Sequence, residues 1–489
     1  MPAEGGAHEA SASDIMLRPD IVPEQPVRLS MLDGALRSTS VCWCFRGQPP
    51  GGAASLQEAF ARVVAKNALL AGRLRPCWAK PGKKPTGLEL GFDEAAGCSF
   101  HVRPMKPLVE EEVERLDADG YVRHFLWAQT SLVESLRLET VGFALDLVGQ
   151  DEPLCRATYC PGERVSLIAL SMSQVLGDMW SFFALLRAWD EEFAAPGSSS
   201  PISGASGQPE ALPRSLEAAR PSWFAQAWEV ALSWVTQTVL GWSPCCAARS
   251  GSLAGVAATD AAAGGASPFE ASAVPRTATL PHQKQDFHIL AVSVEEATLN
   301  RLQSAAASAA ALSGVHFKAT TAEALAAWLG NVLRSRLVRL LVTPRGYAPD
   351  VPVSYFGHAS GYAQYYPPTV GGPGTALGVR RAAEARLAGE RGEVVLPGPD
   401  EHVTLDASSE AQYMPRFGIE EPYLAFQLQH LWQRVPRHSI LRIASNRFAL
   451  CHFVWRRDQG TALAAAWKSL GAPAMSLVSE ANLLESLKS

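Results

Sequence analysis

Two polar side chains, Gln174 and Asp178, stand in the short loop that joins a predicted buried strand over residues 164–172 to a predicted helix over residues 179–193. A glutamine carboxamide donates and accepts hydrogen bonds, so Gln174 can orient a substrate hydroxyl or help to bind an oxyanion. It cannot take up a proton near neutral pH. An aspartate directly before a helix is typical of an N-cap, which predicts a structural role for Asp178.

The other chemically reactive side chains lack the spacing of a known site. The nine cysteines include no CxxC pair, and Cys155 and Cys160 could act as nucleophiles only beside a base, so reduced, buried thiols are favoured. No GxSxG, GxxxxGK[ST] or HExxH motif occurs. Histidines without the spacing of metal ligands predict no metal site. These are His101, His124, His316 and His438.

Segments with strand-like and helix-like patterns alternate along both halves of the chain. Helices are indicated by apolar residues at a spacing near 3.6, and strands by alternating or continuous short apolar runs. The alternation favours an α/β or mixed architecture. The expected strands cover residues 87–92, 164–172 and 287–294, and the expected helices cover residues 55–70, 179–193, 293–310 and 321–337.

A segment rich in Ser, Gly, Ala and Pro over residues 197–285 divides the chain into two halves. It has too few large apolar side chains to form a core. We therefore expect an N-terminal domain over 1–196, this crossover, and a C-terminal domain over 286–489. Within the crossover, residues 222–241 predict an amphipathic helix with a tryptophan-rich face. Its polar face lacks Lys and Arg, so docking onto a globular domain is favoured over peripheral contact with a membrane.

The charge and hydropathy of the chain exclude several classes of partner. The 43 Lys and Arg against 48 Asp and Glu give a net charge of −5, which offers no basic surface for a nucleic acid. No uncharged apolar run reaches the ~20 residues that a spanning helix needs. The first 20 residues lack the apolar core of a secretory signal. We therefore expect a cytoplasmic monomer without a transmembrane segment.

Five short motifs follow one another across residues 30–455. They are Leu70–Arg75 (LAGRLR), Leu170–Asp178 (LSMSQVLGD), Phe287–Ile289 with Glu295 and Glu296 in the next helix, Thr321–Trp328 (TAEALAAW) and Pro352–Ala359 (PVSYFGHA). In order and spacing this set resembles the motifs of the BAHD superfamily of acyl-CoA-dependent acyltransferases.

The resemblance implies two similar chloramphenicol-acetyltransferase-like domains with mixed α/β sheets and a solvent channel between them. In such enzymes the histidine of an HxxxD motif takes a proton from an acceptor hydroxyl or amine while that group attacks an acyl-CoA thioester. This sequence has Gln174 at the position of the histidine, so a general-base role is not supported there. Acyl-CoA would be a co-substrate, and no bound cofactor is expected.

Four further expectations come from the resemblance. Asp178 matches the aspartate of the motif, which is implied to point away from the substrate and to pair with an arginine; Arg345 is the candidate partner. Gly177 belongs to the same motif, with an expected structural role. His358 stands where the family has Asn and is a candidate replacement for the missing base, although a hydrogen-bonded loop histidine is favoured.

Two function classes remain open. The favoured class is transfer of an acyl group from acyl-CoA to a hydroxyl or amine of a small molecule. The alternative is a family member without turnover, which binds a small ligand or serves as a scaffold. The second family signature, DFGWG, is missing from residues 445–457, and the sequence assigns no residue to CoA binding.

Overall fold

The computed structural model describes most residues of two long stretches of the chain. The predicted tryptophan-rich helix over 222–241 lies outside the described residues. Those described are 12–29, 38–77, 87–94, 96–121, 125, 132–142, 147–200, 202, 288–312, 314–343, 345–347, 355–357, 361–367, 375–388, 402–406, 413–428, 437–454, 456–472 and 478–479.

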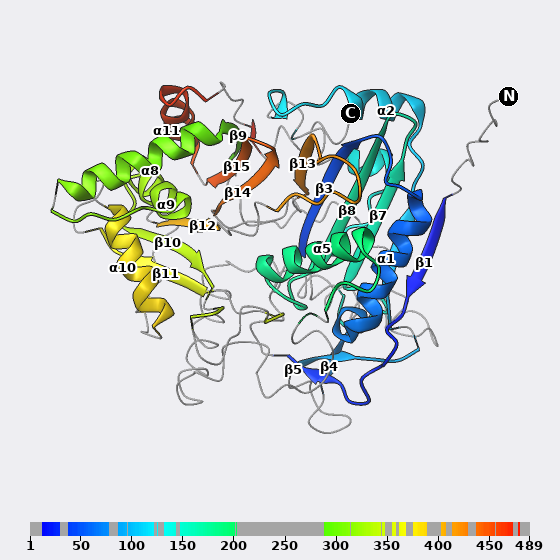
Figure 1. The fold of residues 1–489 in the computed structure, drawn as a ribbon. Coiled ribbons are helices and arrows are strands. Elements are labelled where there is room, and N and C mark those ends of the chain that lie inside the picture. The colour runs from blue at the N-terminus through cyan, green and yellow to red at the C-terminus, as the bar shows by residue number, and fades with distance from the viewer. Residues whose placement is uncertain are drawn as a thin grey trace, which may run out of the picture. The chain divides into compact units, whose positions relative to one another are not determined.

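A mixed sheet of six strands holds most of the first half, in the order β1-β6-β7-β8-β3-β13 (Figure 1). β6 and β7 pair in parallel, and the other neighbours are antiparallel. The strands are β1 (Ser13–Leu17), β3 (Ser38–Arg46), β6 (Cys98–Val102), β7 (Cys155–Pro161), β8 (Val165–Ser173) and β13 (Leu424–Leu428).

The sequence of the central strand β8 does not alternate strictly between apolar and polar residues. Every residue from Val165 to Ser173 is buried, as expected for a strand that is covered on both faces. The predicted strand over 164–172 is thereby confirmed to within one residue.

Helices α1 (Gly52–Lys66) and α5 (Met179–Ala194) pack on one face of this sheet. Trp189 of α5 lies 4.8 Å from the ring of Phe60 in α1 and donates its indole N–H to the carbonyl oxygen of Leu56 at 3.0 Å. Both helices were expected from the spacing of their apolar residues, although the end of the predicted helix over 55–70 is a separate 3-10 turn, Ala68–Ala71.

The strand β13 comes from the second half of the chain but pairs antiparallel with β3, with Phe426 opposite Cys42. Tyr121 stacks on Phe426 with ring centroids 5.2 Å apart. The first sheet therefore includes residues more than 370 positions apart, a pairing that local sequence patterns do not indicate.

A second mixed sheet has seven strands in the order β11-β10-β12-β14-β15-β9-β16. Helices α8, α9 and α11 supply apolar residues to one buried cluster with it. The strands are β9 (His288–Glu295), β10 (Leu337–Val342), β11 (Gly361–Tyr365), β12 (His402–Asp406), β14 (Arg437–Ala444), β15 (Arg447–Val454) and β16 (Val478–Ser479). The helices of this half are α8 (Glu296–Ala311), α9 (Thr321–Val332), α10 (Thr375–Leu387) and α11 (Arg457–Ser469).

The helix predicted over residues 321–337 is shorter in the structure. It begins with a capping box between Thr320 and Glu323 and ends at Val332. Arg334 then adopts a positive φ of 50°, which breaks the helix, and the apolar run from Leu337 continues as strand β10. A short apolar run fits either element, and here the strand pairing decides.

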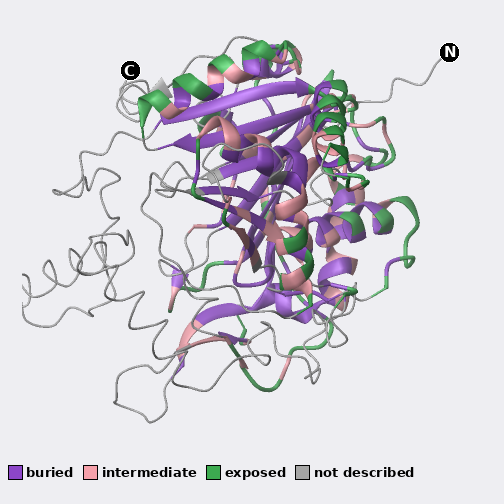
Figure 2. Cartoon of the chain, turned by 90° about the vertical axis from the view of Figure 1, so that its left-hand side faces the viewer, coloured by how far each residue is buried: buried purple, intermediate pink, exposed green. Residues whose placement is uncertain are grey.

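Figure 2 shows that the buried residues of both sheets are flanked by helices with exposed outer faces.

The remaining elements lie within the first half of the chain. A small sheet in the order β2-β5-β4 is formed by β2 (Val27–Arg28), β5 (Gly87–Gly91) and β4 (Arg73–Cys77); the helices are α2 (Pro107–Glu114) and α4 (Val133–Ser135).

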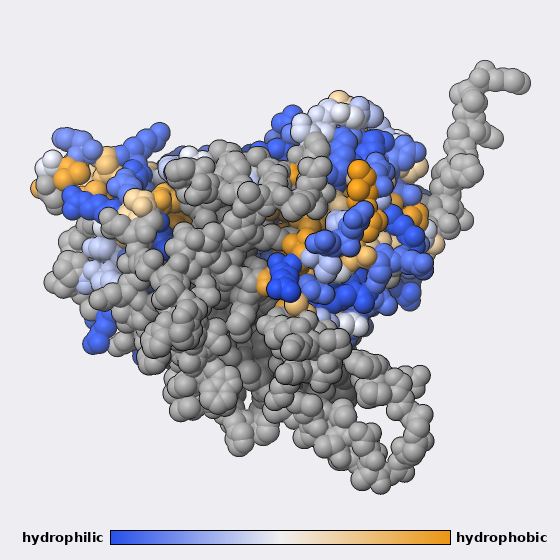
Figure 3. All heavy atoms as spheres, turned by 90° about the horizontal axis from the view of Figure 1, so that it is seen from below, coloured by the Kyte–Doolittle hydropathy of each residue, from blue (hydrophilic) through white to orange (hydrophobic). Residues whose placement is uncertain are grey.

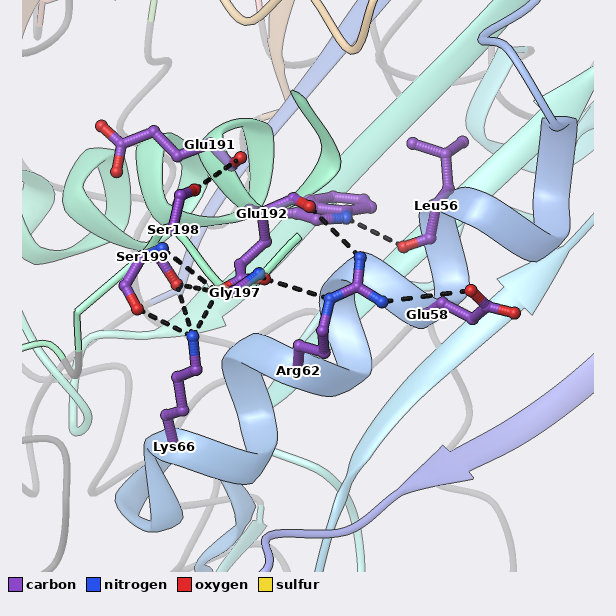
Figure 4. A network of polar contacts seen from close by, with 10 residues as sticks. Leu56, Glu58, Arg62, Lys66, Glu191, Glu192, Gly197, Ser198 and Ser199 are labelled. Atoms are coloured by element: carbon purple, nitrogen blue, oxygen red, sulfur yellow. Dashed lines mark hydrogen bonds and ion pairs between the residues drawn. The ribbon is translucent and has the colours of Figure 1, made fainter. Parts of the chain in front are cut away.

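A buried carboxylate holds the first residues after α5 against α1 (Figure 4). Glu192 is fully buried, and it accepts hydrogen bonds from Arg62 Nε at 3.0 Å and from the backbone N–H of Gly197 at 2.9 Å. Lys66 and Ser199 complete the network. Four partner residues explain how a charged group is tolerated inside the protein.

None of the described helices combines the length and the hydropathy needed to cross a bilayer. On the face drawn in Figure 3, apolar and polar side chains are interspersed among the coloured atoms. The large apolar side chains that are exposed come from separate parts of the chain. They are Met16, Ile21, Val22, Leu108, Leu312, Tyr347 and Tyr366.

Candidate functional site

The candidate site is built on the turn that connects β8 to α5. β8 ends at Ser173, and Asp178 is the N-cap of α5, where one carboxylate oxygen accepts the backbone N–H of Ser181 at 3.1 Å. An aspartate at this position satisfies an N–H that would otherwise lack a partner at the start of the helix. The strand and the cap together fix both ends of the turn that carries Gln174.

Gln174 is half-buried and lies beside the first strand residues of β3. Its Nε2 donates a hydrogen bond to Thr39 Oγ1 at 3.3 Å. It is the one side-chain hydrogen bond of Gln174 with a described residue. Thr39 pairs through its backbone with Met172 of β8, so the two central strands of the sheet position the carboxamide.

Asp178 and Arg345 form a buried, two-pronged ion pair. Arg345 Nη1 donates to Asp178 Oδ2 and Nη2 donates to Oδ1, each at 2.9 Å, and the exposed fractions of the two side chains are 1% and 4%. Such fork-to-fork pairing is strong and directional. The structure therefore brings together two residues that the sequence analysis named as partners.

Arg345 also donates hydrogen bonds to the backbone of the segment Tyr355–Gly357. Nε donates to the carbonyl oxygen of Tyr355 at 2.9 Å, and Nη2 donates to that of Gly357 at 2.8 Å. The guanidinium also lies 4.5 Å from the ring centroid of Trp180, a cation–π distance. Arg345 thus connects the N-terminal end of α5 to the segment Tyr355–Gly357.

Ser181 is a central member of this network that the sequence analysis missed. Its hydroxyl lies 3.0 Å from the Gly357 carbonyl oxygen and accepts the Gly357 N–H at 3.0 Å. It also accepts from Arg345 Nη2 at 3.2 Å. The sequence does carry one indication of this role, because Ser181 is the third residue after the N-cap aspartate. In the first turn of a helix, backbone N–H groups lack intrahelical partners and polar side chains commonly bond to backbone groups.

Gly177 has a packing role beside Ser181. A Cβ added at Gly177 would lie 2.4 Å from Ser181 Cβ and 2.7 Å from its Oγ. Any side chain at position 177 would displace the hydroxyl that holds Gly357. The structure therefore places Gly177, Asp178 and Arg345 in one buried cluster next to the turn of Gln174.

The remaining candidate residues of the sequence analysis are not described as part of this cluster. His358 lies outside the described residues. A hydrogen bond with Cys98, together with burial, raises the pKa of the Cys155 thiol, and burial raises the pKa of the Cys160 thiol, as expected for unreactive cysteines. The seven cysteines that the structure describes are buried.

His438 belongs to a separate buried group in the second sheet. Its Nδ1 lies 2.8 Å from Nδ1 of His452, whose Nε2 accepts the indole N–H of Trp467 at 2.9 Å. An indole only donates, so the proton of neutral His452 must be on Nδ1. Burial lowers the pKa of His452 well below its ordinary value.

The DFGWG signature is missing from residues 445–457, of which the structure describes 445–454, 456 and 457. Ser445 and Asn446 connect β14 to β15, and α11 begins at Arg457. Among the described residues of this hairpin, β15 pairs with β14 on one side and with β9 on the other.

Comparisons with known proteins give matches only among solved structures. No protein-family model matches this sequence, and no curated protein matches it. A structure of F. sporotrichioides TRI101 complexed with coenzyme A and T-2 is similar to this chain with a TM-score of 0.55 and 13% identity, covering 93% of this chain and 100% of that chain.

Two further structures share the architecture. Vinorine synthase has a TM-score of 0.55 and 12% identity, covering 94% of this chain and 97% of its own. The condensation domain of the Monacolin K polyketide synthase MokA has a TM-score of 0.50 and 12% identity, covering 92% and 97%. The chain has the two-domain, chloramphenicol-acetyltransferase-like fold of these proteins, which confirms the predicted fold class.

Proposed function

We propose that this protein transfers an acyl group from an acyl-CoA thioester to a hydroxyl or amine of a small molecule. The support is a fold shared over more than 90% of the chain with TRI101, which was solved with coenzyme A and T-2 bound. Acyl-CoA is a co-substrate in this proposal, so no resident cofactor or metal is required.

The observation that carries the proposal is the intact support for residue 174. A buried cluster holds the start of α5 against the backbone of Gly357. Its members are Asp178, Arg345, Ser181 and Gly177. Catalysis by proximity and orientation needs side chains that are held in a fixed position beside the reacting atoms. A buried ion pair is costly to maintain, so its presence beside the half-buried, polar Gln174 favours a site.

Gln174 would act by hydrogen bonding rather than by proton transfer. Its carboxamide donates and accepts. It can orient the attacking group through Oε1 or donate to the oxygen that becomes negative in the tetrahedral intermediate, an interaction that typically contributes 10²–10³-fold. The base that the resemblance implies is not supplied by Gln174 itself.

The proposal divides the chain into acyltransferase-like halves over residues 1–196 and 286–489, linked by residues 197–285, with β13 returning to the first sheet. A monomer is proposed, and the molar mass in solution tests it. The proposal assigns no residue to CoA binding, because residues 445–457 lack the DFGWG signature.

The second candidate function is a protein without turnover that binds a small ligand. The specific observation in its favour is the absence of a titratable group at position 174, since general-base catalysis contributes about 10²–10⁴-fold. Under this alternative the buried cluster around Asp178 serves only to maintain the fold.

A thiol-release assay discriminates between the two functions. The full-length protein is incubated with acetyl-, hexanoyl- and benzoyl-CoA and a panel of small alcohols and amines, and free CoA and the acylated product are measured. Acceptor-dependent release of CoA with one product per thiol supports acyl transfer. Binding of acyl-CoA or acceptor without release above background favours the second function.

A further inference from the structure

The face of the second sheet that is turned away from α8 and α9 changes from apolar to polar across its strands. On β9, β14 and β15 it carries apolar residues that share one buried cluster with the core of the first half. They are Ile289, Ala291, Leu441, Ala449, Cys451 and Phe453. On β12, β10 and β11 the same face carries a polar patch. Its residues are Asp406, Thr404, Arg339, Gln364 and Tyr362.

The strand register places Arg339 in the middle of this polar patch. Val338 and Leu340 of β10 belong to the buried cluster on the helix side of the sheet, so Arg339 between them lies on the opposite face. Arg339 pairs with Gln364 of β11 and with Thr404 of β12. Neighbouring strands are about 4.8 Å apart, so the three side chains lie side by side.

A tyrosine and a buried carboxylate fix the position of the Arg339 guanidinium. The guanidinium carbon lies 5.3 Å from the ring centroid of Tyr362, a cation–π distance. The Tyr362 hydroxyl donates a hydrogen bond to Asp406 Oδ1 at 3.0 Å, and Asp406 is only 8% exposed. The carboxylate therefore holds the ring, and the ring holds the guanidinium.

The guanidinium of Arg339 keeps donors that no described residue uses. Arg339 is half-buried, and its Nε is buried without a hydrogen-bond partner among the described residues. Its other nitrogens form no hydrogen bond or ion pair with a described residue either. An unsatisfied buried donor costs about 1–3 kcal/mol, which a ligand can remove. The planar fork of a guanidinium matches the two oxygens of a carboxylate or a phosphate.

Strand β10 leads from the polar patch to the candidate site. Thr343 directly follows β10, and its hydroxyl accepts a hydrogen bond from Arg345 Nη1 at 2.8 Å. Four residues of extended chain separate Arg339 from Thr343, which corresponds to about 13 Å. A molecule with an anionic group at Arg339 can therefore have its other end at the buried cluster of Asp178 and Arg345.

We infer that Arg339 binds a carboxylate or phosphate group of a substrate, an inference that depends on the proposed acyl transfer. The anion accepts hydrogen bonds from Nε and from one Nη, while the ring of Tyr362 keeps the fork in place. The group belongs either to the acceptor, as a carboxylate, or to acyl-CoA, as a phosphate. No bond is made or broken at Arg339.

The first arm of the test varies the charge of the acceptor. The probes are 6-hydroxyhexanoate, 12-hydroxydodecanoate and 4-hydroxyphenylacetate, each with its methyl ester, and acetyl-CoA is the donor. If Arg339 binds the carboxylate, the wild type prefers the acid to the ester. Arg339→Gln should then lower kcat/KM for the acid about 10- to 100-fold, the value of a hydrogen bond to a charged group, and leave the ester unchanged.

The second arm varies the charge of the donor. Acetyl-CoA is compared with acetyl-3′-dephospho-CoA at a fixed concentration of acceptor. If Arg339 binds a phosphate of the donor, Arg339→Gln should raise KM for acetyl-CoA about 10- to 100-fold with every acceptor. A loss confined to acetyl-CoA identifies the 3′-phosphate, whereas an equal loss with both donors identifies the pyrophosphate.

Two further variants separate anion binding from packing. Arg46→Gln is the matched control, because Arg46 also lies over a tyrosine ring, 4.9 Å from the centroid of Tyr423, but is exposed. It should change none of these values. Arg339→Lys keeps the charge without the planar fork and should recover part of the loss. No preference for any acid over its ester, together with unchanged KM for both donors in Arg339→Gln, overturns the inference and leaves acyl transfer intact.

Thermal unfolding tests the same site without turnover. Release of no CoA with any acceptor contradicts the proposed function, and the unfolding midpoint is then measured with and without CoA and the three acids at millimolar concentration. A ligand that binds the folded protein raises the midpoint. A rise in the wild type that is lost in Arg339→Gln supports the anion site. No rise with any of these ligands, or the same rise in both proteins, contradicts it.

Discussion

Arg345 donates two 2.9 Å hydrogen bonds to the two carboxylate oxygens of Asp178, although 167 positions separate these residues in the sequence. The pair is almost completely enclosed, with exposed fractions of 1% and 4%. It connects the N-cap of α5 to the backbone of Tyr355 and Gly357. The turn with Gln174 therefore depends on a contact between distant parts of the chain.

Removing the charge of Asp178 should strongly destabilise the protein. Asp178→Asn leaves the Arg345 guanidinium buried without its counter-ion, which typically costs 3–5 kcal/mol. Urea denaturation followed by fluorescence measures the change. Glu111→Gln is the control, because Arg115 and Glu111 are 74% and 47% exposed and such pairs contribute at most about 1 kcal/mol. Equal effects of both variants would contradict the structural role of the buried pair.

Gly177→Ala should displace Ser181. The new Cβ would meet Ser181 Cβ at 2.4 Å, and relief requires movement that breaks the hydrogen bonds to Gly357; overpacking of this kind costs about 1–3 kcal/mol. Gly142→Ala is the matched control, since its nearest neighbour, Leu147, would lie at an ordinary 3.8 Å. The thermal midpoint of each variant is measured, and a Gly177→Ala midpoint equal to that of the control contradicts this packing role.

Stability should fall as the pH drops below 6.5 because of His452. Burial holds its pKa well below the ordinary value, so the unfolded chain binds a proton that the folded chain does not. The penalty is absent above pH 6.5 and grows by about 1.4 kcal/mol per pH unit below it. Denaturant titrations between pH 5 and 8 should show a shallower slope for His452→Gln, whereas the exposed His316→Gln should keep the wild-type slope. An unchanged slope in His452→Gln rules out this source.

Glu192 should stabilise the protein at neutral pH through its ionised form. Its pKa is lowered from 4.5 to about 2 by hydrogen bonds from Lys66, Ser199, Gly197 and Arg62, which outweigh burial. Stability from this group is complete above pH 4.5 and is lost as the pH falls toward 2. Glu192→Gln should cost about 3 kcal/mol at pH 7 and remove that pH dependence.

The control for Glu192 is Glu58→Gln, because Glu58 is 72% exposed and lies 3.9 Å from Arg62. Its effect on the urea midpoint at pH 7 should be within about 1 kcal/mol. Limited proteolysis then asks whether Glu192→Gln also frees residues 197–199 from α1. Equal midpoints for the two variants would mean that the network of Figure 4 contributes no net stability.

The sequence predicted the local elements of the site because their signals are local. The mostly apolar sequence of β8 and the aspartate N-cap of α5 define the turn of Gln174 without knowledge of the rest of the chain. The pairing of Asp178 with Arg345 was expected from the family resemblance alone, because no local pattern relates two residues so far apart.

Other features could not be predicted for the same physical reason. β13 has an ordinary strand composition, and nothing in it indicates pairing with β3. Leu337–Val342 is an apolar run compatible with a helix or a strand, and the partners β11 and β12 decide for a strand. Ser181 is recognised as important only when Gly357 is seen beside it.

The central claim is that the turn between β8 and α5 presents residue 174 to an acyl-transfer site. The most direct test measures CoA release by Gln174→His with an alcohol acceptor. A histidine there would restore the missing general base. The proposed function predicts a gain in kcat/KM for alcohols of about 10²–10⁴-fold over the wild type, with an inflection near the ordinary histidine pKa of about 6.5. A correctly folded Gln174→His that releases no CoA above the wild-type rate with any acceptor of the panel would contradict it.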